Sequence, residues 1–147
     1  MKKIVICGKE YEINATAFTR FEYKKLFGEG IFHDINILNS ISVKQNEIRE
    51  TAKEKGIKEE EINTLISNVL MDNLDDFIDV IEKITFILIH TANPQINDFE
   101  DWLRTIEKID LSASWISEVT EFAVASFCWW GCNWIFRKTQ IWIFKRG

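Results

Sequence analysis

The stretch EEEINTLISNVLMDNLDDFIDVIEKITFILIH, residues 59–90, decides the fold of this chain. Its apolar side chains recur every three or four residues over roughly eight turns, which is the period of one face of an α-helix. Asn93-Pro94 follows, and a residue before proline is pushed out of the helical conformation. We therefore predict one helix from residue 59 to about residue 90. Its apolar stripe consists of Ile62, Leu65, Ile66, Val69, Leu70, Leu74, Phe77, Ile78, Ile81, Ile84 and Leu88.

Upstream of this helix, KKIVICGKEYEIN at residues 2–14 predicts a β-hairpin. Two β-rich runs flank Gly8-Lys9, and glycine at the first central position suits a type II′ turn. Tyr11 and Ile13 alternate with glutamates, which indicates one buried and one solvated face. A two-stranded hairpin is only marginally stable alone, so we expect it to pack on helices.

A first helix is predicted for residues 16–27, with Thr16 as its N-cap and Gly28 just beyond its end. Its large apolar side chains lie on one side, opposite Arg20, Lys24 and Lys25. We expect the hairpin and this helix to form one unit, with Phe18 and Phe21 buried between them. The apolar side consists of Phe18, Phe21, Leu26 and Phe27.

Four further segments complete the expected fold. Residues 31–41 predict a short helix, and residues 44–61 an exposed helix or a flexible linker with a break at Gly56. Two helices follow Pro94, one capped by Asn97 or Asp98 and the other by Ser112. The fold class is therefore mainly α, with a small N-terminal β-hairpin packed on a bundle of about five helices. We assign residues 1–127 to this helical domain.

Bulk composition narrows the class of protein. The 147 residues, 46% apolar and 28% charged, suit a single globular domain. Cys7, Cys128 and Cys132 are odd in number and follow no secretory signal, which favours a reducing cytoplasm. The longest uncharged apolar run, residues 84–92, is about half of what a membrane span requires. A net charge of −5 argues against nucleic acid as the partner.

The composition changes abruptly near Cys128. All 23 acidic residues lie at or before Glu121, and four of the six tryptophans lie in residues 129–147. That stretch carries four basic side chains, whereas the rest of the chain has 14 basic against 23 acidic residues. We therefore separate residues 128–147 as a basic, Trp-rich C-terminal tail. The tail suits a hairpin or irregular segment docked on the body or on a partner, a disordered segment, or a membrane contact.

The acidic row at residues 72–79 resembles a metal-binding motif. Residues 75–79, DDFID, match the DDxxD spacing with which isoprenoid diphosphate synthases hold magnesium and diphosphate. Those enzymes need a much larger helical cavity and a second metal motif, so we interpret the carboxylates as a solvated helix face. His33 and His90 are too isolated for a zinc site, and the sequence has no phosphate-binding glycine motif. We predict no catalytic residue, no metal, no cofactor and no enzymatic activity.

Two stretches carry a family resemblance. GKEYEINATAFTRFEYKKLFG at residues 8–28 resembles the N-terminal region of tail assembly chaperones from long-tailed phages and prophages of Gram-positive bacteria. LSASWISEVTEFAVASF at residues 111–127 resembles the helix that closes the body of such proteins. The likeness covers about residues 1–127 and consists of a pattern along the chain rather than a catalytic signature.

The resemblance implies a non-enzymatic role in virion morphogenesis. Such chaperones bind and solubilise the tape-measure protein in the host cytoplasm, assist tail-tube polymerisation, and are absent from the mature virion. Many occur with a longer product of programmed ribosomal frameshifting, whose extra domain recruits the tail-tube protein. We hypothesise that residues 128–147 lie beyond the slippage region, either as the end of the short product or as the start of the other frame.

Exposed aromatic side chains are the expected binding surface for the client. The same side chains also suit the core of the domain. Self-association of the chain is a further alternative. The acidic body favours a client with basic segments, and we expect neither nucleic acid nor a membrane as partner. The alternative functions are a tail structural or adaptor protein retained in the virion, and a membrane-active accessory protein. The expected partner-binding residues are Trp102, Trp115, Phe122, Trp129, Trp130 and Trp134.

Overall fold

An antiparallel hairpin begins the chain in the computed structural model, which describes residues 1–127. Its strands are β1 (Lys2–Ile6) and β2 (Lys9–Ile13), with Ile4 opposite Tyr11. Tyr11 and Ile13 are buried while the glutamates between and before them are exposed, as the alternation predicts. The Trp-rich tail, with every prediction made for it, lies outside the described residues.

The hairpin turn differs from the expected one. Ile6 pairs with Lys9, so Cys7 and Gly8 are the two central residues. Both have positive φ angles, 50° and 80°, which is the signature of a type I′ turn rather than the expected type II′ turn at Gly8-Lys9. Type I′ turns match the right-handed twist of the strands, and glycine accepts the left-handed conformation without steric cost.

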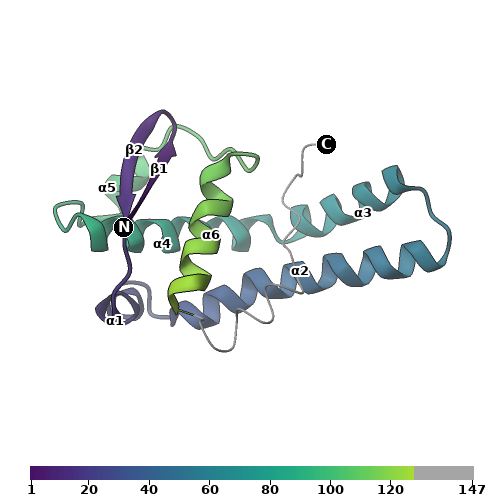
Figure 1. Cartoon of the computed structure of the whole chain (residues 1–147), viewed down its shortest axis with the longest axis horizontal. Coiled ribbons are helices and arrows are strands. Elements are labelled where there is room, and N and C mark those ends of the chain that lie inside the picture. The colour runs from purple at the N-terminus through teal and green to yellow at the C-terminus, as the bar shows by residue number, and fades with distance from the viewer. Residues whose placement is uncertain (128–147) are drawn as a thin grey trace.

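The predicted fold class is confirmed, because a hairpin followed by six helices makes up residues 1–127 (Figure 1). Helix α4 is central: it runs through the middle of the molecule and contacts β2 and each of the other five helices. Every side chain from residue 84 to residue 89 is buried, as expected for a helix surrounded by others. The helices are α1 (Ala17–Phe27), α2 (Ile31–Glu54), α3 (Glu59–Asp72), α4 (Leu74–Ala92), α5 (Phe99–Arg104) and α6 (Ser114–Phe127).

The long apolar stripe forms two helices rather than one. Asn73, with φ −116° and ψ 19°, separates α3 from α4. Its side-chain amide donates a hydrogen bond of 2.8 Å to the carbonyl oxygen of Val69. Asparagine competes in this way with the helical backbone bonds, so a helix ends there although the apolar spacing continues.

Helix α2 is longer than predicted and forms a protruding arm with α3. Both helices extend beyond the body at the right of Figure 1, and Gly56, with φ 71°, lies in the turn between them as expected. Ala52 packs there against Ile62 and Ile66 in a small core separate from the main one. The segment predicted to be an exposed helix or a linker is therefore helical as far as Glu54.

The hairpin packs against α4 and α6, and α1 packs against α4 and α2. The backbone N–H of Asn14 donates to the carbonyl oxygen of Leu88 at 3.1 Å, which fixes the chain after β2 on α4. The expected burial of Phe18 and Phe21 between the hairpin and α1 is wrong, since 59% of each residue is exposed. Helix α1 presents its other side to the core.

The last two helices follow the predicted order. Asp98 caps α5, because its carboxylate accepts a hydrogen bond of 2.9 Å from the backbone N–H of Asp101. Helix α6 begins at Ser114, two residues after the expected cap Ser112, whose hydroxyl instead donates to Asp110 at 2.6 Å. None of the helices within residues 1–127 has the length and apolarity that a membrane span requires.

Candidate functional site

The inward side of α1 is polar, which is unusual for a helix packed on a core. Thr19 and Tyr23 are fully buried there, and Glu22 is half-buried between them. Each of the three side chains has a partner on another helix: Thr91 and His90 on α4, and Asp34 on α2. Buried polar groups are costly without partners, so these pairs fix which side of α1 faces inward.

A chain of hydrogen bonds joins the start of α1 to α4. The backbone N–H of Thr16 donates to the hydroxyl of Thr19 at 3.0 Å. The hydroxyl of Thr91 donates to the carbonyl oxygen of Ile87 at 2.8 Å, so the 2.8 Å bond between the two threonines is donated by Thr19. Each hydroxyl both donates and accepts, which satisfies a buried polar strip.

The pair Tyr23 and Asp34 connects α1 to α2. The phenol hydroxyl donates to one carboxylate oxygen of Asp34, and His33 Nδ1 lies 3.2 Å from the other oxygen. Burial, followed by the hydrogen bond to Asp34, raises the pKa of the Tyr23 phenol well above its usual range. The phenol therefore stays neutral and acts as a donor. The ring of Phe27 packs edge-on against Tyr23, with 4.9 Å between ring centroids.

His90 connects α1 to the loop after α4. Its Nδ1 lies 2.8 Å from the carbonyl oxygen of Ile96, and its Nε2 lies 2.9 Å from a carboxylate oxygen of Glu22. Each ring nitrogen therefore faces one oxygen atom, and the two contacts fix the orientation of the ring. The ring also stacks on Phe86 at 5.8 Å. Glu22 is thereby turned away from the outer surface of α1.

The outward side of α1 carries exposed aromatic rings. Phe18 and Phe21 stack on each other with 5.5 Å between their centroids and 26° between their planes. Leu26 on the same helix and Phe32 at the start of α2 are also exposed. We call the stacked pair Phe18 and Phe21 the aromatic face. An exposed apolar cluster of this kind on a folded domain marks a contact site more often than a structural element.

A pocket lies beside the aromatic face. It has a volume of about 430 Å³ and lies where the start of α1, the start of α2 and the end of α6 meet. Phe32 and Phe127 supply apolar walls, and Arg20 supplies a positive charge. We call it the α1 pocket. It is lined by Ala15, Thr16, Ala17, Arg20, Phe32, Ser126 and Phe127.

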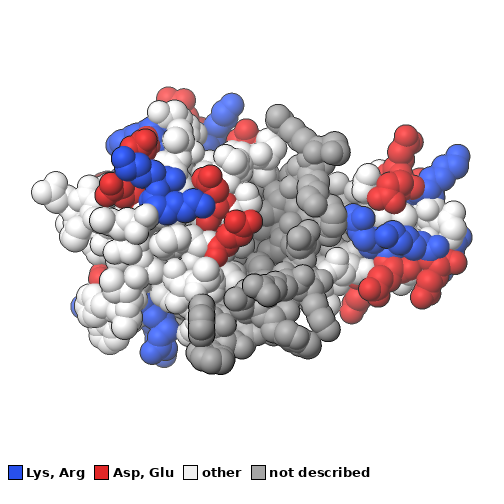
Figure 2. All heavy atoms as spheres, viewed as in Figure 1, with Lys and Arg blue, Asp and Glu red and all other residues white. Residues whose placement is uncertain are grey.

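The outer surface of α1 is basic in a chain with a net charge of −5. Arg20, Lys24 and Lys25 are exposed, and no carboxylate within residues 1–127 lies within 4.0 Å of their charged nitrogens. Figure 2 shows the surface over α1, at the lower left, as mostly white with a blue patch. The exposed residues of α1 therefore include both aromatic and cationic side chains.

Three of the six side chains expected to bind a partner lie in or against the main core. Trp102 and Trp115 are buried in the main core, and Phe122 is half-buried against it. Trp102 packs on Phe86 with 5.8 Å between centroids. Partner binding through these three side chains stays a prediction, and it would require the helices around them to separate. The others, Trp129, Trp130 and Trp134, lie outside the described residues.

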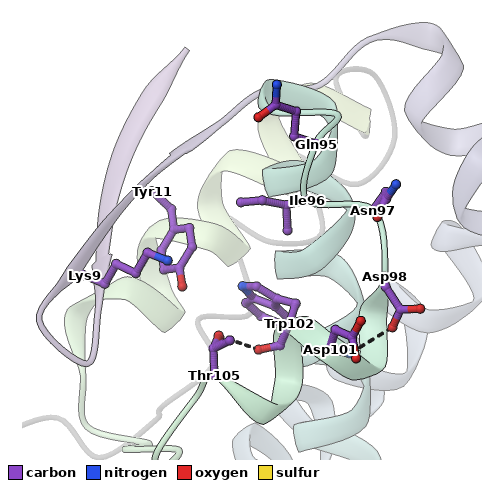
Figure 3. A pocket seen from close by; sticks show the side chains of 9 residues that line it. All are labelled: Lys9, Tyr11, Gln95, Ile96, Asn97, Asp98, Asp101, Trp102 and Thr105. Carbon is purple, nitrogen blue, oxygen red and sulfur yellow. Dashed lines mark hydrogen bonds between the residues drawn. The ribbon is translucent and has the colours of Figure 1, made fainter.

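A second pocket, of about 250 Å³, lies between the hairpin and α5 (Figure 3). Lys9 and Tyr11 reach it from β2, with the Lys9 ammonium 5.1 Å from the centre of the Tyr11 ring. The indole nitrogen of Trp102 is buried and has no hydrogen-bond partner within residues 1–127. The carboxylate of Asp98 is already used to cap α5. Asp101, Gln95, Asn97 and Thr105 also line the pocket, which therefore combines one ammonium and two carboxylates with neutral polar groups.

The acidic row at residues 72–79 does not form a metal site in the described part of the chain. Over residues 1–127, no three His, Cys, Asp or Glu side chains are placed to hold a metal ion together. Burial and then the neighbouring Asp79 raise the pKa of the Glu82 carboxyl. This arrangement suits a partly solvated acidic surface on α4.

Comparison of the chain with protein-family models, with curated proteins and with solved structures gave no match. The aromatic face was also missed from sequence, because Phe18 and Phe21 at a spacing of three share one side of a helix whether that side is buried or exposed. One feature of the sequence could have predicted it: Thr19, Glu22 and Tyr23 share a different side of α1, and they are stable inside a protein only with specific hydrogen-bond partners.

Proposed function

We propose that this protein is a non-enzymatic assembly chaperone for phage tails, which binds the tape-measure protein and keeps it soluble while the tail tube polymerises. The observation that carries the proposal is the stacked pair Phe18 and Phe21, each 59% exposed on α1. A chaperone needs exposed apolar surface to compete with the aggregation of its client. The tape-measure protein as client comes from the resemblance of residues 8–28 and 111–127.

The packing of α1 supports this proposal. Rotating the helix about its axis would bury the two phenylalanines, yet the bonds from Thr19, Glu22 and Tyr23 oppose that rotation. Each of these hydrogen bonds that is broken would leave a buried polar group without a partner, which costs roughly 1–3 kcal/mol of stability per group. The aromatic face is therefore a stable property of the fold rather than an incompletely packed core.

The location of the exposed aromatic rings also suits a client that binds transiently. Phe18 and Phe21 stack on each other outside the main core around α4, so contact with a client leaves that core intact. A client can then bind and leave without unfolding the chaperone. The remaining parts of the proposal rest on the family resemblance, namely action in the host cytoplasm, absence from the mature virion, and a longer frameshift product that recruits the tail-tube protein.

Co-expression with the tape-measure protein tests the proposal. The intact chain should increase the soluble fraction of the tape-measure protein, and the double variant Phe18→Ser with Phe21→Ser should lose this effect. Met71→Ser is the matched control, since Met71 on α3 is similarly exposed but distant from α1 in the sequence. An equal loss in the control, or none in the double variant, would reject the aromatic face as the client site.

Mass spectrometry of purified virions separates this proposal from a structural role. A chaperone should be absent from the particles, whereas a tail adaptor should be present in a fixed ratio to the other tail proteins. Detection of the chain in mature particles would therefore replace the chaperone by the adaptor.

A further inference from the structure

The charge on the outer side of α1 specifies what kind of partner fits there. The helix contains one acidic residue, Glu22, and that carboxylate is turned inward to His90. Lys24 and Lys25 follow Phe21 at helical spacings of three and four, and together with Arg20 they are exposed and have no carboxylate within 4.0 Å among residues 1–127. Unpaired cations beside exposed rings favour a partner that supplies carboxylates together with apolar side chains.

The backbone of α1 limits the partner to side-chain contacts. Away from the two ends of the helix its N–H and C=O groups bond to each other, and the N–H of Gly28 donates to the carbonyl oxygen of Lys24 at 2.9 Å. A partner cannot add a strand to this surface. A second helix can pack there, because apolar residues spaced by three and four match the spacing of Phe18 and Phe21.

The α1 pocket adds an anchor point to this surface. Its volume of about 430 Å³ accepts a large apolar side chain between Phe32 and Phe127. Arg20 lines the same pocket, and a guanidinium binds a carboxylate with two parallel hydrogen bonds. A partner segment with a large apolar residue next to an acidic one would satisfy both groups at once.

We infer that the outer side of α1 binds an amphipathic helix of the client whose apolar stripe is flanked by acidic residues. The inference rests on the proposed chaperone function and specifies the client segment. It reverses the expectation of a basic client that net charge suggests, because the local charge at the aromatic face is opposite in sign to that of the whole chain. Attraction at short range depends on the nearest charges.

Binding of two synthetic peptides to the full chain tests the inference. Both are helices of about 20 residues with the same leucine stripe, flanked by glutamates in one and by lysines in the other. Fluorescence anisotropy should show roughly ten-fold or tighter binding of the glutamate peptide, weakened as NaCl rises from about 50 to about 500 mM. Equal or tighter binding of the lysine peptide would overturn the inference.

Variants identify the surface responsible. Arg20→Gln, Lys24→Gln and Lys25→Gln together should abolish the preference for the glutamate peptide. The control, Lys53→Gln, Lys55→Gln and Lys58→Gln, makes the same change in net charge at exposed positions on the α2–α3 arm and should keep it. Loss of the preference in both variants, or in neither, would mean that α1 is not the site.

Peptide binding and client solubilisation are independent measurements. The first tests the binding surface, and the second tests the proposed function. If the peptide preference holds but the chain fails to solubilise the tape-measure protein, the surface is right and the proposed function is wrong. If solubilisation holds without the preference, the function survives and this inference fails. A chain that is dimeric by light scattering and becomes monomeric on Phe18→Ser with Phe21→Ser, without binding either peptide, would assign the face to a second copy and overturn the inference.

Discussion

The phenol of Tyr23 on α1 donates a hydrogen bond to the carboxylate of Asp34 on α2, and both side chains are buried. Asp34 lies in the first turn of α2, so this one bond sets how the two helices meet after the short turn at Gly28. With Tyr23 directed inward, the helical period places Phe18 and Phe21 on the outside. A buried polar pair thus produces the exposed aromatic face.

Tyr23→Phe should lower the free energy of unfolding by about 1–3 kcal/mol at neutral pH. The substitution keeps the ring but leaves a buried carboxylate oxygen of Asp34 without its donor. Urea denaturation followed by circular dichroism measures the change. Tyr11→Phe is the control, because Tyr11 is also buried but no hydrogen bond of its hydroxyl is formed within residues 1–127. Equal losses in the two variants would contradict the role of the bond.

The same bond predicts a pH dependence. In the folded chain the pKa of Tyr23 is raised above the usual phenol value of 10.0, so the folded state keeps a proton that the unfolded state releases. The stability that this group contributes is complete below about pH 10 and is lost as pH rises further. Thermal unfolding from about pH 8 to about pH 11 should show a smaller loss of stability in Tyr23→Phe than in the unmodified chain. Parallel losses would exclude this linkage.

Phe18→Ala and Phe21→Ala should each change the stability by no more than about 0.5–1 kcal/mol, because the rings contact each other and solvent rather than the core. Phe77→Ala, which removes a fully buried ring from α4, should cost about 3–5 kcal/mol. Chemical denaturation of the three variants compares them directly. A loss of several kcal/mol at Phe18 or Phe21 would show that the aromatic face is buried in solution.

Gly28→Ala should destabilise the fold by about 1 kcal/mol. Gly28 ends α1 with φ 81°, and no atom lies within 4 Å of the position where a Cβ would be, so backbone conformation alone sets the cost. Gly28→Asn should lose less stability than Gly28→Ala, because asparagine tolerates the left-handed conformation better than alanine. The difference in denaturation midpoint between the two variants is the measurement, and a larger loss for asparagine would contradict this account.

Glu22→Gln and His90→Gln should show coupled losses of stability, since the two side chains hold α1 on α4 across 2.9 Å. Residues in direct contact typically have coupling energies of roughly 0.5–3 kcal/mol. A double-mutant cycle by urea denaturation measures this coupling. Additive losses would show that α1 does not depend on the pair.

Much of the secondary structure followed from local patterns. Alternation identified the strands around Tyr11 and Ile13, and apolar spacing identified residues 59 to about 90, which include α4, as helical. The break at Asn73 was missed because its effect depends on a side-chain bond to Val69, which does not alter the apolar period. Helix α2 was underestimated because its polar second half is stabilised by Ile62 and Ile66 of α3.

The sequence by itself determined where the hairpin and most of the helical segments lie, and that Phe18 and Phe21 share one side of α1. Only the tertiary structure decided which side of α1 is buried. Thr19, Glu22 and Tyr23 have partners that are 72, 68 and 11 residues away in the chain. The physical reason is that a polar side chain is stable inside only when a specific partner meets it, and the period of a helix contains no information on where such partners lie.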